Sequence, residues 1–476
     1  MATMVYHKRP NFIQNLLVST QGARIRRKRY THHTWEVFDF LKNSQFWTQA
    51  QFESFQAERL IRLVRHAIKH SPYYAGLYAS RMLSEKDIKT VSDIKKFPIV
   101  SKEEFRENNE SIVSTHIVRK RMWAAFTSGT SGVPLKAFFS HENMQDRIAF
   151  LERLYHWYSP GKWRKRASFT GKLIVDPEDS SGTFHRYNYC INQQLYSSHH
   201  LSENNLARYV KDLTKFAPDQ IDGIASAIYV VADYMLRNGQ AGQLKPNVVI
   251  PTSETIWPHI RERLEKAFGC KMANQYGSQE GAPIAYECPA GGFHISPESG
   301  IFEILRTDNS SCKPGEPGRM VVTSFSSEGT PLIRYDIGDV ASWRSGTCSC
   351  GRHMPMLETI EGRLDDMFFT TERGIVPRID SAFKGLPSVI IATQIAQVGQ
   401  DSFEVRIVPQ KNGYYPKYAD SIVDHLYDYL GASVDIKLKV VEGISRTRGG
   451  KLPAMVNEYH DQDMKIDALS SWNIVK

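Results

Sequence analysis

The chain has no long apolar run and few cysteines, and each absence excludes a class of protein. Among its 476 residues, no stretch approaches the roughly 20 apolar residues that a membrane-spanning helix needs. The first residues, from Met1 to Lys8, contain no apolar core of the kind that directs export. Six cysteines in so long a chain do not make a disulfide framework. We therefore expect a cytoplasmic protein without a membrane partner, in which clustered cysteines are better suited to metal binding.

The chain also lacks repeats, low-complexity segments and the motifs of two common functional classes. A serine hydrolase needs a Gly-x-Ser-x-Gly elbow, and the segment from Gly223 to Ala227 lacks the closing glycine. The densest basic patch, from Arg24 to Arg29, has neither interleaved aromatic residues nor a DNA-reading motif beside it. The net charge of +9 suits anionic partners of several kinds. A solvated basic surface is the simpler interpretation, and we expect no nucleic-acid partner.

The spacing of apolar residues predicts a helical N-terminal third and a mixed middle. Residues 60–68 carry apolar side chains at helical spacing, and so do residues 144–158, after a possible N-cap at Ser140. Residues 320–324 are rich in strand-forming side chains. A chain of this length can bury a large core and form more than one domain.

A distinct C-terminal unit is predicted after a boundary near Arg363. Apolar and polar residues alternate over 403–407 and again over 434–440, which is typical of strands. Between these two stretches, residues 419–430 have the pattern of a helix. The resulting β-α-β order is compact enough for a small domain of its own.

A segment rich in glycine and hydroxyl side chains is the most informative part of the chain. It reads TSGTSGVPLK from Thr127 to Lys136, between apolar runs that predict strands over 122–126 and 135–139. Its glycines permit backbone conformations that bring successive N–H groups close to a phosphate. The glycines are not followed by the Lys-Ser/Thr pair of a Walker loop. Taken alone, the segment is also typical of a plain surface turn.

Four more polar motifs follow in a definite order, and each offers groups that a nucleotide-activating enzyme needs. They are YGSQE at Tyr276, IRYDIGD at Ile333, EGRLDD at Glu361 and GGK at Gly449. In this order the chain resembles the acyl-adenylate-forming enzymes, within them the branch of phenylacetate-CoA ligases and capsular polysaccharide biosynthesis proteins. The resemblance extends over the chain from about residue 60 onward. Outside this order, each motif would be an ordinary turn.

The resemblance implies an α/β fold with two domains and an active site at their junction. We expect a large N-terminal adenylate-forming domain over residues 1–362, which binds ATP and an acid, and a small mobile α+β domain over 363–476. The implied reaction joins a carboxylate, aryl or hydrophobic in character, to the α-phosphate of ATP. A thiol or amine then attacks the acyl-AMP. Such chemistry needs donors around the phosphates and Mg²⁺ held by oxygen ligands.

The resemblance also assigns roles to individual residues of the ATP site. Tyr276 lies against adenine, Asp339 accepts from the ribose hydroxyls, and Glu280 leads to Mg²⁺. Many relatives carry lysine where this chain has Val133, so backbone donors must do most of the phosphate holding, with cationic help from Lys136 or elsewhere. The implied ATP-binding residues are Thr127, Ser128, Gly129, Thr130, Ser131, Gly132, Tyr276, Gly277, Ser278, Asp339 and Arg363.

Two C-terminal positions match residues that take part in the domain movement of the family's enzymes. Asp365 matches the hinge about which the small domain rotates between the two half-reactions. Lys451 matches the mobile lysine that bridges carboxylate and phosphate during adenylation. A long point charge on a Gly-rich segment can enter and leave a site. The alternative is a solvated basic loop made of Arg446, Arg448 and Lys451.

The sequence does not determine the identity of the acid or of the acceptor. The segment after Gly223 matches the place where relatives line the acyl pocket, although a packed helix turn is equally natural there. Coenzyme A is the favoured acceptor, and an amide-forming ligase or a transferase of AMP to a hydroxyl are the alternatives. A non-catalytic relative is disfavoured because Glu280, Asp339, Asp365 and Lys451 are all present. The expected pocket residues are Trp123, Phe126, Ile224 and Ala225.

Two short clusters of soft ligands predict a metal site. Cys288 lies six positions before His294, and Cys348 lies two positions before Cys350. A Cys₃His set suits tetrahedral Zn²⁺, although Cys-x-Cys is less typical of zinc than Cys-x-x-Cys. Some members of the resembled branch bind a structural zinc at matching positions. Scattered buried cysteines are the alternative. The three remaining cysteines, Cys190, Cys270 and Cys312, lack companions, and we interpret them as core or surface thiols.

Overall fold

The computed structural model divides the chain into two compact units, which are described separately. The first unit comprises Met1–Ala23, Gly161–Asn274 and Glu361–Lys476, and the second comprises Arg24–Pro160 and Gln275–Ile360. The residues that the structure describes are 6–7, 9–116, 122–126, 136–176, 178–179, 182–254, 256, 258–363, 368–372, 374–376, 390–409, 423, 426–427, 430–445 and 455–459.

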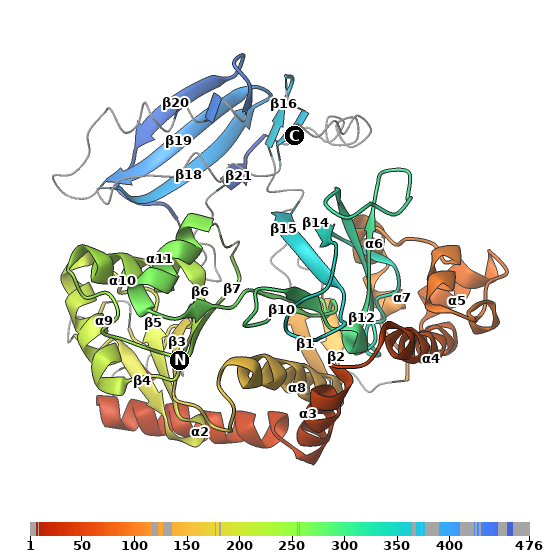
Figure 1. Ribbon diagram of the computed structural model, residues 1–476, viewed down its shortest axis with the longest axis horizontal. Coiled ribbons are helices and arrows are strands. Elements are labelled where there is room, and N and C mark those ends of the chain that lie inside the picture. Colours follow the sequence, from red (N-terminus) through yellow and green to blue (C-terminus); the bar gives the residue numbers. More distant parts are fainter. Residues whose placement is uncertain are drawn as a thin grey trace. The chain divides into compact units, whose positions relative to one another are not determined.

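The N-terminal third is helical, as predicted (Figure 1). The apolar stretch from Leu60 lies within α4, whose Thr48 cap accepts a hydrogen bond from the backbone N–H of Gln51 at 3.4 Å. Leu60, Leu63 and Val64 form the buried face of this helix. The helices and short 3₁₀ turns are α2 (Asn11–Arg29), α3 (His32–Ser44), α4 (Gln49–His70), α5 (Pro72–Ala79), η1 (Glu85–Asp87), η2 (Val91–Lys96), α6 (Lys102–Glu107) and α7 (Asn109–Ile112).

The second unit is built around a seven-stranded sheet in the order β12-β13-β14-β15-β11-β10-β9. Its core joins side chains of α4, α5 and α6 to the inner face of the sheet, for example Tyr74 and Phe105 with Tyr335. Helix α8 (His141–Tyr158) starts at Ser140, whose hydroxyl accepts from the backbone N–H of Asn143 at 3.0 Å, as predicted. The strands are β9 (Gln275–Tyr276), β10 (Ala285–Glu287), β11 (Phe293–Ile295), β12 (Gly300–Leu305), β13 (Pro317–Ser324), β14 (Tyr335–Arg344) and β15 (Met356–Arg363), with η5 (Pro297–Ser299) between β11 and β12.

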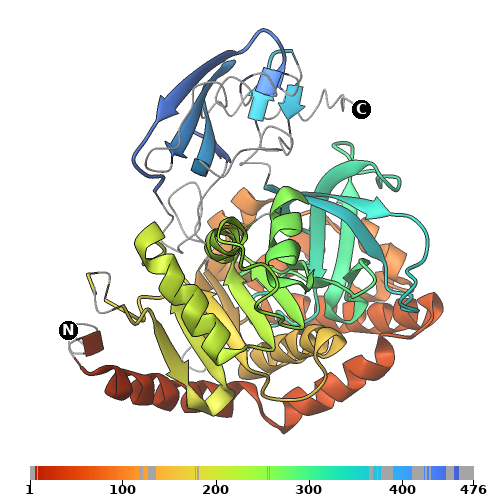
Figure 2. The ribbon, with the colours of Figure 1, turned by 60° about the vertical axis from the view of Figure 1, so that its left-hand side comes forward.

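The first unit contains a six-stranded sheet in the order β4-β5-β3-β6-β7-β8. Strands β3, β5, β6, β7 and β8 pair in parallel and only β4 is antiparallel to its neighbour. Helices α9, α10 and α11 pack along this sheet (Figure 2). The elements are β3 (Arg166–Thr170), β4 (His185–Asn188), η4 (Tyr189–Ile191), β5 (Gln193–Ser197), α9 (Glu203–Phe216), β6 (Gln220–Ile224), α10 (Ala225–Arg237), β7 (Val248–Thr252), α11 (Pro258–Phe268) and β8 (Lys271–Met272).

The C-terminal segment has its own sheet, in the order β20-β19-β18-β21. Phe403, Val405 and Ile407 are buried along β19, which confirms the predicted alternation. The alternation in β20 is weaker, since Val440 is 57 % exposed. Residues 423, 426–427 and 430 are helical, within the stretch predicted as a helix. The strands are β16 (Phe368–Thr370), β17 (Gly374–Val376), β18 (Ile390–Gly399), β19 (Ser402–Pro409), β20 (Asp435–Val440) and β21 (Met455–Asn457).

Within the described part of the chain, no helix combines the length and the apolar character needed to cross a membrane.

A fully buried ion pair ties α8 to the loop that leads into β12. The guanidinium of Arg153 donates to Glu298 at 2.8 Å, and neither side chain is more than 1 % exposed. Arg153 also donates to the hydroxyl of Ser296 at 2.7 Å, and Ser44 of α3 donates to Glu298 at 2.6 Å. Because buried charges lose their hydration, this pair is stable only with all of its partners in place.

Replacement of Arg153 should therefore destabilise the protein strongly. We expect Arg153→Met to lower the free energy of unfolding by about 3 to 5 kcal/mol, because Glu298 stays buried without its cation. The matched control is Arg62→Met, which breaks an exposed pair with Glu58 and should cost at most about 1 kcal/mol. Urea unfolding followed by tryptophan fluorescence measures both. Equal losses in the two variants would contradict the role given to the buried pair.

Candidate functional site

The glycine-rich segment connects two short antiparallel strands of the second unit. Strand β1 (Trp123–Phe126) pairs with β2 (Lys136–Phe139), in a register that opposes Phe126 to Lys136. The two strands predicted on either side of the loop are thus confirmed. The six loop residues themselves, Thr127, Ser128, Gly129, Thr130, Ser131 and Gly132, lie outside the described residues.

Two of the predicted nucleotide residues meet directly. Tyr276 ends β9 and Asp339 lies in β14, 63 positions later, and the Tyr276 hydroxyl donates to Oδ2 of Asp339 at 2.6 Å. The Tyr276 ring lies 6.1 Å from that of Phe302 between centroids. A hydrogen bond to an ionised acceptor is stronger than a neutral one, so it holds ring and carboxylate in a defined geometry.

The loop after β9 is held by an arginine that the sequence did not single out. Arg147 of α8 donates to the backbone carbonyl of Ser278 at 2.9 Å. The Ser278 hydroxyl in turn accepts from the backbone N–H of Ala282 at 3.1 Å. Burial lowers the pKa of Arg147, and the charges of Tyr286 and Glu280 oppose that shift. Arg147 interrupts the apolar row of α8 between Met144 and Leu151, which is the one sequence signal that marks it.

Glu280 is buried within this loop, with 2 % of its surface exposed. Carboxylates seldom lie in a protein interior without a cationic partner, either a side chain or a metal ion. The charge of Arg147 acts on Glu280 from one side. Glu280 is therefore chemically suited to an oxygen-seeking cation such as Mg²⁺.

Gly281 lets the same loop lie directly against β2. Its φ is +97°, and a Cβ built there would come within 2.6 Å of the Phe139 ring. Gly277 has more room, since its nearest neighbour would be the Arg147 guanidinium at 3.9 Å. The close approach at Gly281 explains why the loop needs glycine at this position.

The four residues predicted to line an acyl pocket lie in different units. Trp123 is on β1 and 44 % exposed, with the Arg29 guanidinium 5.8 Å from its ring centroid. Phe126 ends the same strand. Ile224 and Ala225 belong to the other unit, where β6 ends and α10 begins, and both are buried in its core. Their burial is compatible with the alternative of a packed helix turn.

The structure describes only part of the three residues predicted near the C-terminal domain. Arg363 is the last residue of β15, and its side chain is not described. Asp365 and Lys451 lie outside the described residues.

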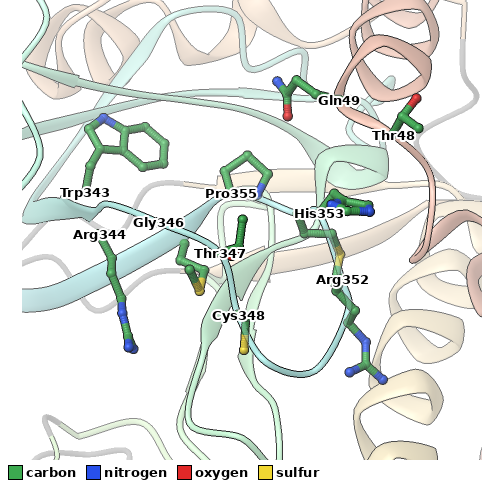
Figure 3. A pocket seen from close by; sticks show the side chains of 12 residues that line it. Thr48, Gln49, Trp343, Arg344, Gly346, Thr347, Cys348, Arg352, His353 and Pro355 are labelled. Atoms are coloured by element: carbon green, nitrogen blue, oxygen red, sulfur yellow. The ribbon is translucent and has the colours of Figure 1, made fainter.

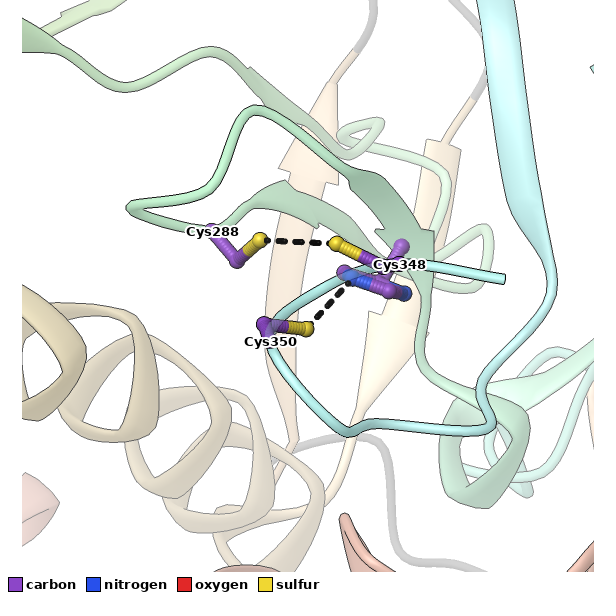
Figure 4. Close-up of side chains that lie close together, drawn as sticks. Cys288, Cys348 and Cys350 are labelled. Carbon is purple, nitrogen blue, oxygen red and sulfur yellow. Dashed lines mark hydrogen bonds between the residues drawn. The ribbon is translucent and has the colours of Figure 1, made fainter. Parts of the chain in front are cut away.

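The predicted metal ligands converge in the second unit. Cys288 follows β10, His294 lies in β11, and Cys348 and Cys350 lie between β14 and β15. Their ligand atoms all lie within 4.8 Å of one another. The Cys288 and Cys348 sulfurs are 3.6 Å apart, and the Cys350 sulfur is 3.3 Å from Nε2 of His294 (Figure 4). The predicted convergence of the two short clusters is thus observed.

Residues around the cysteine cluster orient His294 and leave space between the ligand atoms. Nδ1 of His294 bonds to the carbonyl of Met354 at 3.1 Å, which directs Nε2 toward the sulfurs. Burial lowers the pKa of His294 to about 4, so the ring is neutral and able to ligate. Gly292 provides the space, since a Cβ there would lie 2.7 Å from the Cys348 sulfur.

The thiols differ in their ease of ionisation. Burial raises the pKa of Cys288 to about 12. Burial acts in the same direction on Cys350, but hydrogen bonds, first from Arg352 and then from Cys348 and Cys288, lower the pKa of Cys350 below its ordinary value. A bound cation would lower the pKa of both thiols and stabilise the thiolates.

A cavity of about 480 Å³ lies beside this cluster, on the surface of the second unit (Figure 3). Trp343 and Arg344 from the end of β14 line it together with Cys348, Arg352 and others. The Arg352 guanidinium lies 4.3 Å from the ring centroid of Trp157 and donates to Gln45 at 2.9 Å. Among the described residues, Tyr276, Gly277, Ser278 and Asp339 do not line this cavity.

Comparison with known proteins agrees with this fold. A family model described as the CapK C-terminal domain matches residues 368–458. Protein CapK of Staphylococcus aureus is 28 % identical over 462 residues, which cover 96 % of this chain and 99 % of that protein. A phenylacetate-coenzyme A ligase of Thermus thermophilus is 22 % identical over 84 % of this chain and 95 % of its own. A solved 2-hydroxyisobutyryl-CoA ligase in complex with 2-HIB-AMP has a TM-score of 0.70, at 18 % identity over 90 % of this chain and 94 % of its own.

The fold is therefore the mixed α/β fold of adenylate-forming CoA ligases, with a separate C-terminal domain. The chain is similar to CapK over almost its whole length and to a phenylacetate-CoA ligase over most of it. The resemblance predicted from the order of five motifs is confirmed.

The contact at Gly281 gives a stability prediction. Gly281→Ala should destabilise the protein more than Gly315→Ala, a matched control with φ +79° and no atom within 4 Å of the added Cβ. Positive φ alone should cost the control about 1 to 2 kcal/mol, whereas the Gly281 variant must also displace Phe139. Thermal melting of both variants measures the difference. If Gly281→Ala melted at or above the control, the close packing of this loop on β2 would be wrong.

Proposed function

We propose that the protein uses ATP to convert a carboxylic acid to acyl-AMP and then transfers the acyl group to a thiol, coenzyme A being the favoured one. The observation that carries this proposal is the hydrogen bond from Tyr276 to Asp339, together with the buried Glu280 four positions after Tyr276. Relatives named phenylacetate-coenzyme A ligase, and the fold shared with a CoA ligase bound to an acyl-AMP, support the same reaction class.

In this proposal the loop after β9 and strand β14 receive the nucleoside. The Tyr276 ring offers a flat surface for adenine, and Asp339 accepts from the ribose hydroxyls. A carboxylate accepts several hydrogen bonds, so the bond from Tyr276 is compatible with that role and orients the carboxylate for it. Gly277 and Ser278 contribute backbone groups to the same surface. The segment from Thr127 to Gly132 holds the β- and γ-phosphates, and Arg363 contacts the nucleotide from β15.

Glu280 would hold Mg²⁺, which supplies positive charge to the phosphates when bound. Its burial and its place two residues after the carbonyl anchored by Arg147 support this role. Arg147 acts on Glu280 as a positioning residue, because it fixes the backbone of the loop. Loss of the Glu280 charge would leave the cation without its protein ligand.

The two half-reactions would use two arrangements of the domains 1–362 and 363–476. Asp365 is the hinge, and Lys451 neutralises charge between carboxylate and phosphate only during adenylation. Trp123, Phe126, Ile224 and Ala225 would line the acid pocket, with room for an aryl or hydrophobic acid. The protein would act in the cytoplasm on small molecules, without nucleic acid or membrane partners. An amine acceptor, or AMP transfer to a hydroxyl, is the second candidate, since acyl activation is common to these ligases.

Activation can be tested before the acceptor is known. Full-length protein is incubated with ATP, Mg²⁺ and a panel of aryl and alkyl acids, with hydroxylamine to trap acyl-AMP. Hydroxamate formed from a subset of the acids is the expected result. Absence of hydroxamate and of pyrophosphate release with every acid would overturn the proposed activation step.

Two variants test the roles within that reaction. Glu280→Gln and Lys451→Ala should each slow acyl-AMP formation by on the order of a hundredfold, because each removes charge from the transition state. Transfer from preformed acyl-AMP to coenzyme A should suffer much less in Lys451→Ala, since the lysine has left the site by then. The control is Lys437→Ala, on an exposed side chain of β20. An equal loss of both half-reactions in Lys451→Ala would contradict the mobile-lysine role.

For the cysteine cluster we propose a structural Zn²⁺ held by Cys288, His294, Cys348 and Cys350. The convergence of three sulfurs and a neutral imidazole supports this choice, because zinc prefers such soft and borderline ligands in tetrahedral geometry. Four protein ligands leave no open position for substrate. The ion would join the β10–β11 hairpin to the β14–β15 connection and stabilise both.

Purification without chelator should yield about one zinc per chain. Cys348→Ser should lose the metal and lower the melting temperature, because the ligands have no preformed site in the unfolded chain. Cys190→Ser serves as control and should keep both, since Cys190 lies in the other unit. Elemental analysis and melting curves are the measurements. A metal-free parent with the same melting temperature as Cys348→Ser excludes the zinc site.

A further inference from the structure

Three histidines form a cluster on the second unit, outside the residues considered so far. His66 and His70 lie one turn apart on α4, and their ring centroids are 4.9 Å apart. His116, four residues after the end of α7, brings a third ring within 4.6 Å of His70 and 6.5 Å of His66. All three side chains reach solvent.

The protein backbone holds these rings together. Residues at positions i and i+4 share one face of a helix, which places His66 beside His70. The backbone N–H and the hydroxyl of Thr115 both donate to the carbonyl of His70, at 2.8 and 3.1 Å. The segment that carries His116 is thus fixed to the last turn of α4.

The tautomer of His66 is set by a neighbouring loop. Nε2 of His66 lies 3.0 Å from the backbone carbonyl of Glu328, and a carbonyl can only accept. Nε2 therefore carries the proton and Nδ1 carries the lone pair. A neutral imidazole with an oriented lone pair is the form that ligates metal ions.

From this geometry we propose that His66, His70 and His116 bind a divalent first-row transition cation through their imidazole nitrogens. Imidazole suits zinc, copper and nickel, and two histidines one helical turn apart can reach the same ion. The rings of His66 and His116 are tilted by 48° and 32° relative to the His70 ring, so the three sets of nitrogens converge on one ion only after rotation about the χ bonds. Water completes the coordination, because the cluster faces solvent. The donor set differs from that of the sulfur-rich cluster, because it contains imidazole nitrogens and no thiolate.

The test uses Ni²⁺, which favours imidazole over the buried thiolates. Untagged full-length protein, purified without chelator, is titrated with Ni²⁺ by isothermal calorimetry. We expect one saturable site, weakened at least about tenfold in each of His66→Ala, His70→Ala and His116→Ala, because loss of a direct ligand costs no less than loss of an outer partner. Cys348→Ser should bind Ni²⁺ as the parent does.

The matched control is His32→Ala, an 88 % exposed helical histidine of α3, which should leave the titration unchanged. Melting curves establish that each variant is folded, and His66→Gln, His70→Gln or His116→Gln replaces the alanine variant of the same residue where that variant is not. Parent protein with no binding below about 1 mM Ni²⁺ would overturn the proposal. So would binding that survives in the folded His66→Ala/His70→Ala double variant.

Discussion

Two arginines on α8, the buried Arg153 and the partly buried Arg147, constrain the second unit through polar contacts with distant parts of the chain. Arg153 forms an ion pair with Glu298, and both side chains are buried. Arg147 lies one and two-thirds helical turns before Arg153 and donates to the carbonyl of Ser278. A buried guanidinium tolerates few arrangements, because each displaced donor leaves an unpaired group in the interior. The position of α8 against the sheet is therefore tightly defined. Both candidate sites of this unit depend on it.

The seven-stranded sheet connects the functional residues of this unit through hydrogen-bonded strands. Strands β9, β10 and β11 are consecutive neighbours, and β15 and β14 follow them in the sheet. Tyr276 ends the first of these strands, His294 lies in the third, and Asp339 lies in β14. The nucleotide residues and the cysteine cluster thus share one hydrogen-bonded framework. A metal ion across the β10–β11 and β14–β15 connections would restrict the same strands that present Tyr276 and Asp339.

In the proposed two-step reaction, the C-terminal domain would change its orientation between the half-reactions. The C-terminal sheet has its own core around Phe403 and Val405, and it is matched by a family model of its own. A domain with an independent core can change its orientation without unfolding. This property is what alternation between adenylation and transfer requires. The parallel sheet of the first unit likewise has a separate apolar core.

The sequence predicted helices, strands and a helix cap, because these depend on residues close to one another in the chain. Helical spacing located α4 and α8, the Ser140 cap marked where α8 begins, and alternation located β19. The order of the motifs predicted the resemblance that the comparisons confirm, and the two short clusters predicted that Cys288, His294, Cys348 and Cys350 converge. Only the tertiary structure showed that Tyr276 bonds to Asp339, that Arg147 supports the loop before Glu280, and that Gly281 lies on Phe139. These contacts join residues far apart in the chain, and strand order and helix position decide them, which no local pattern encodes.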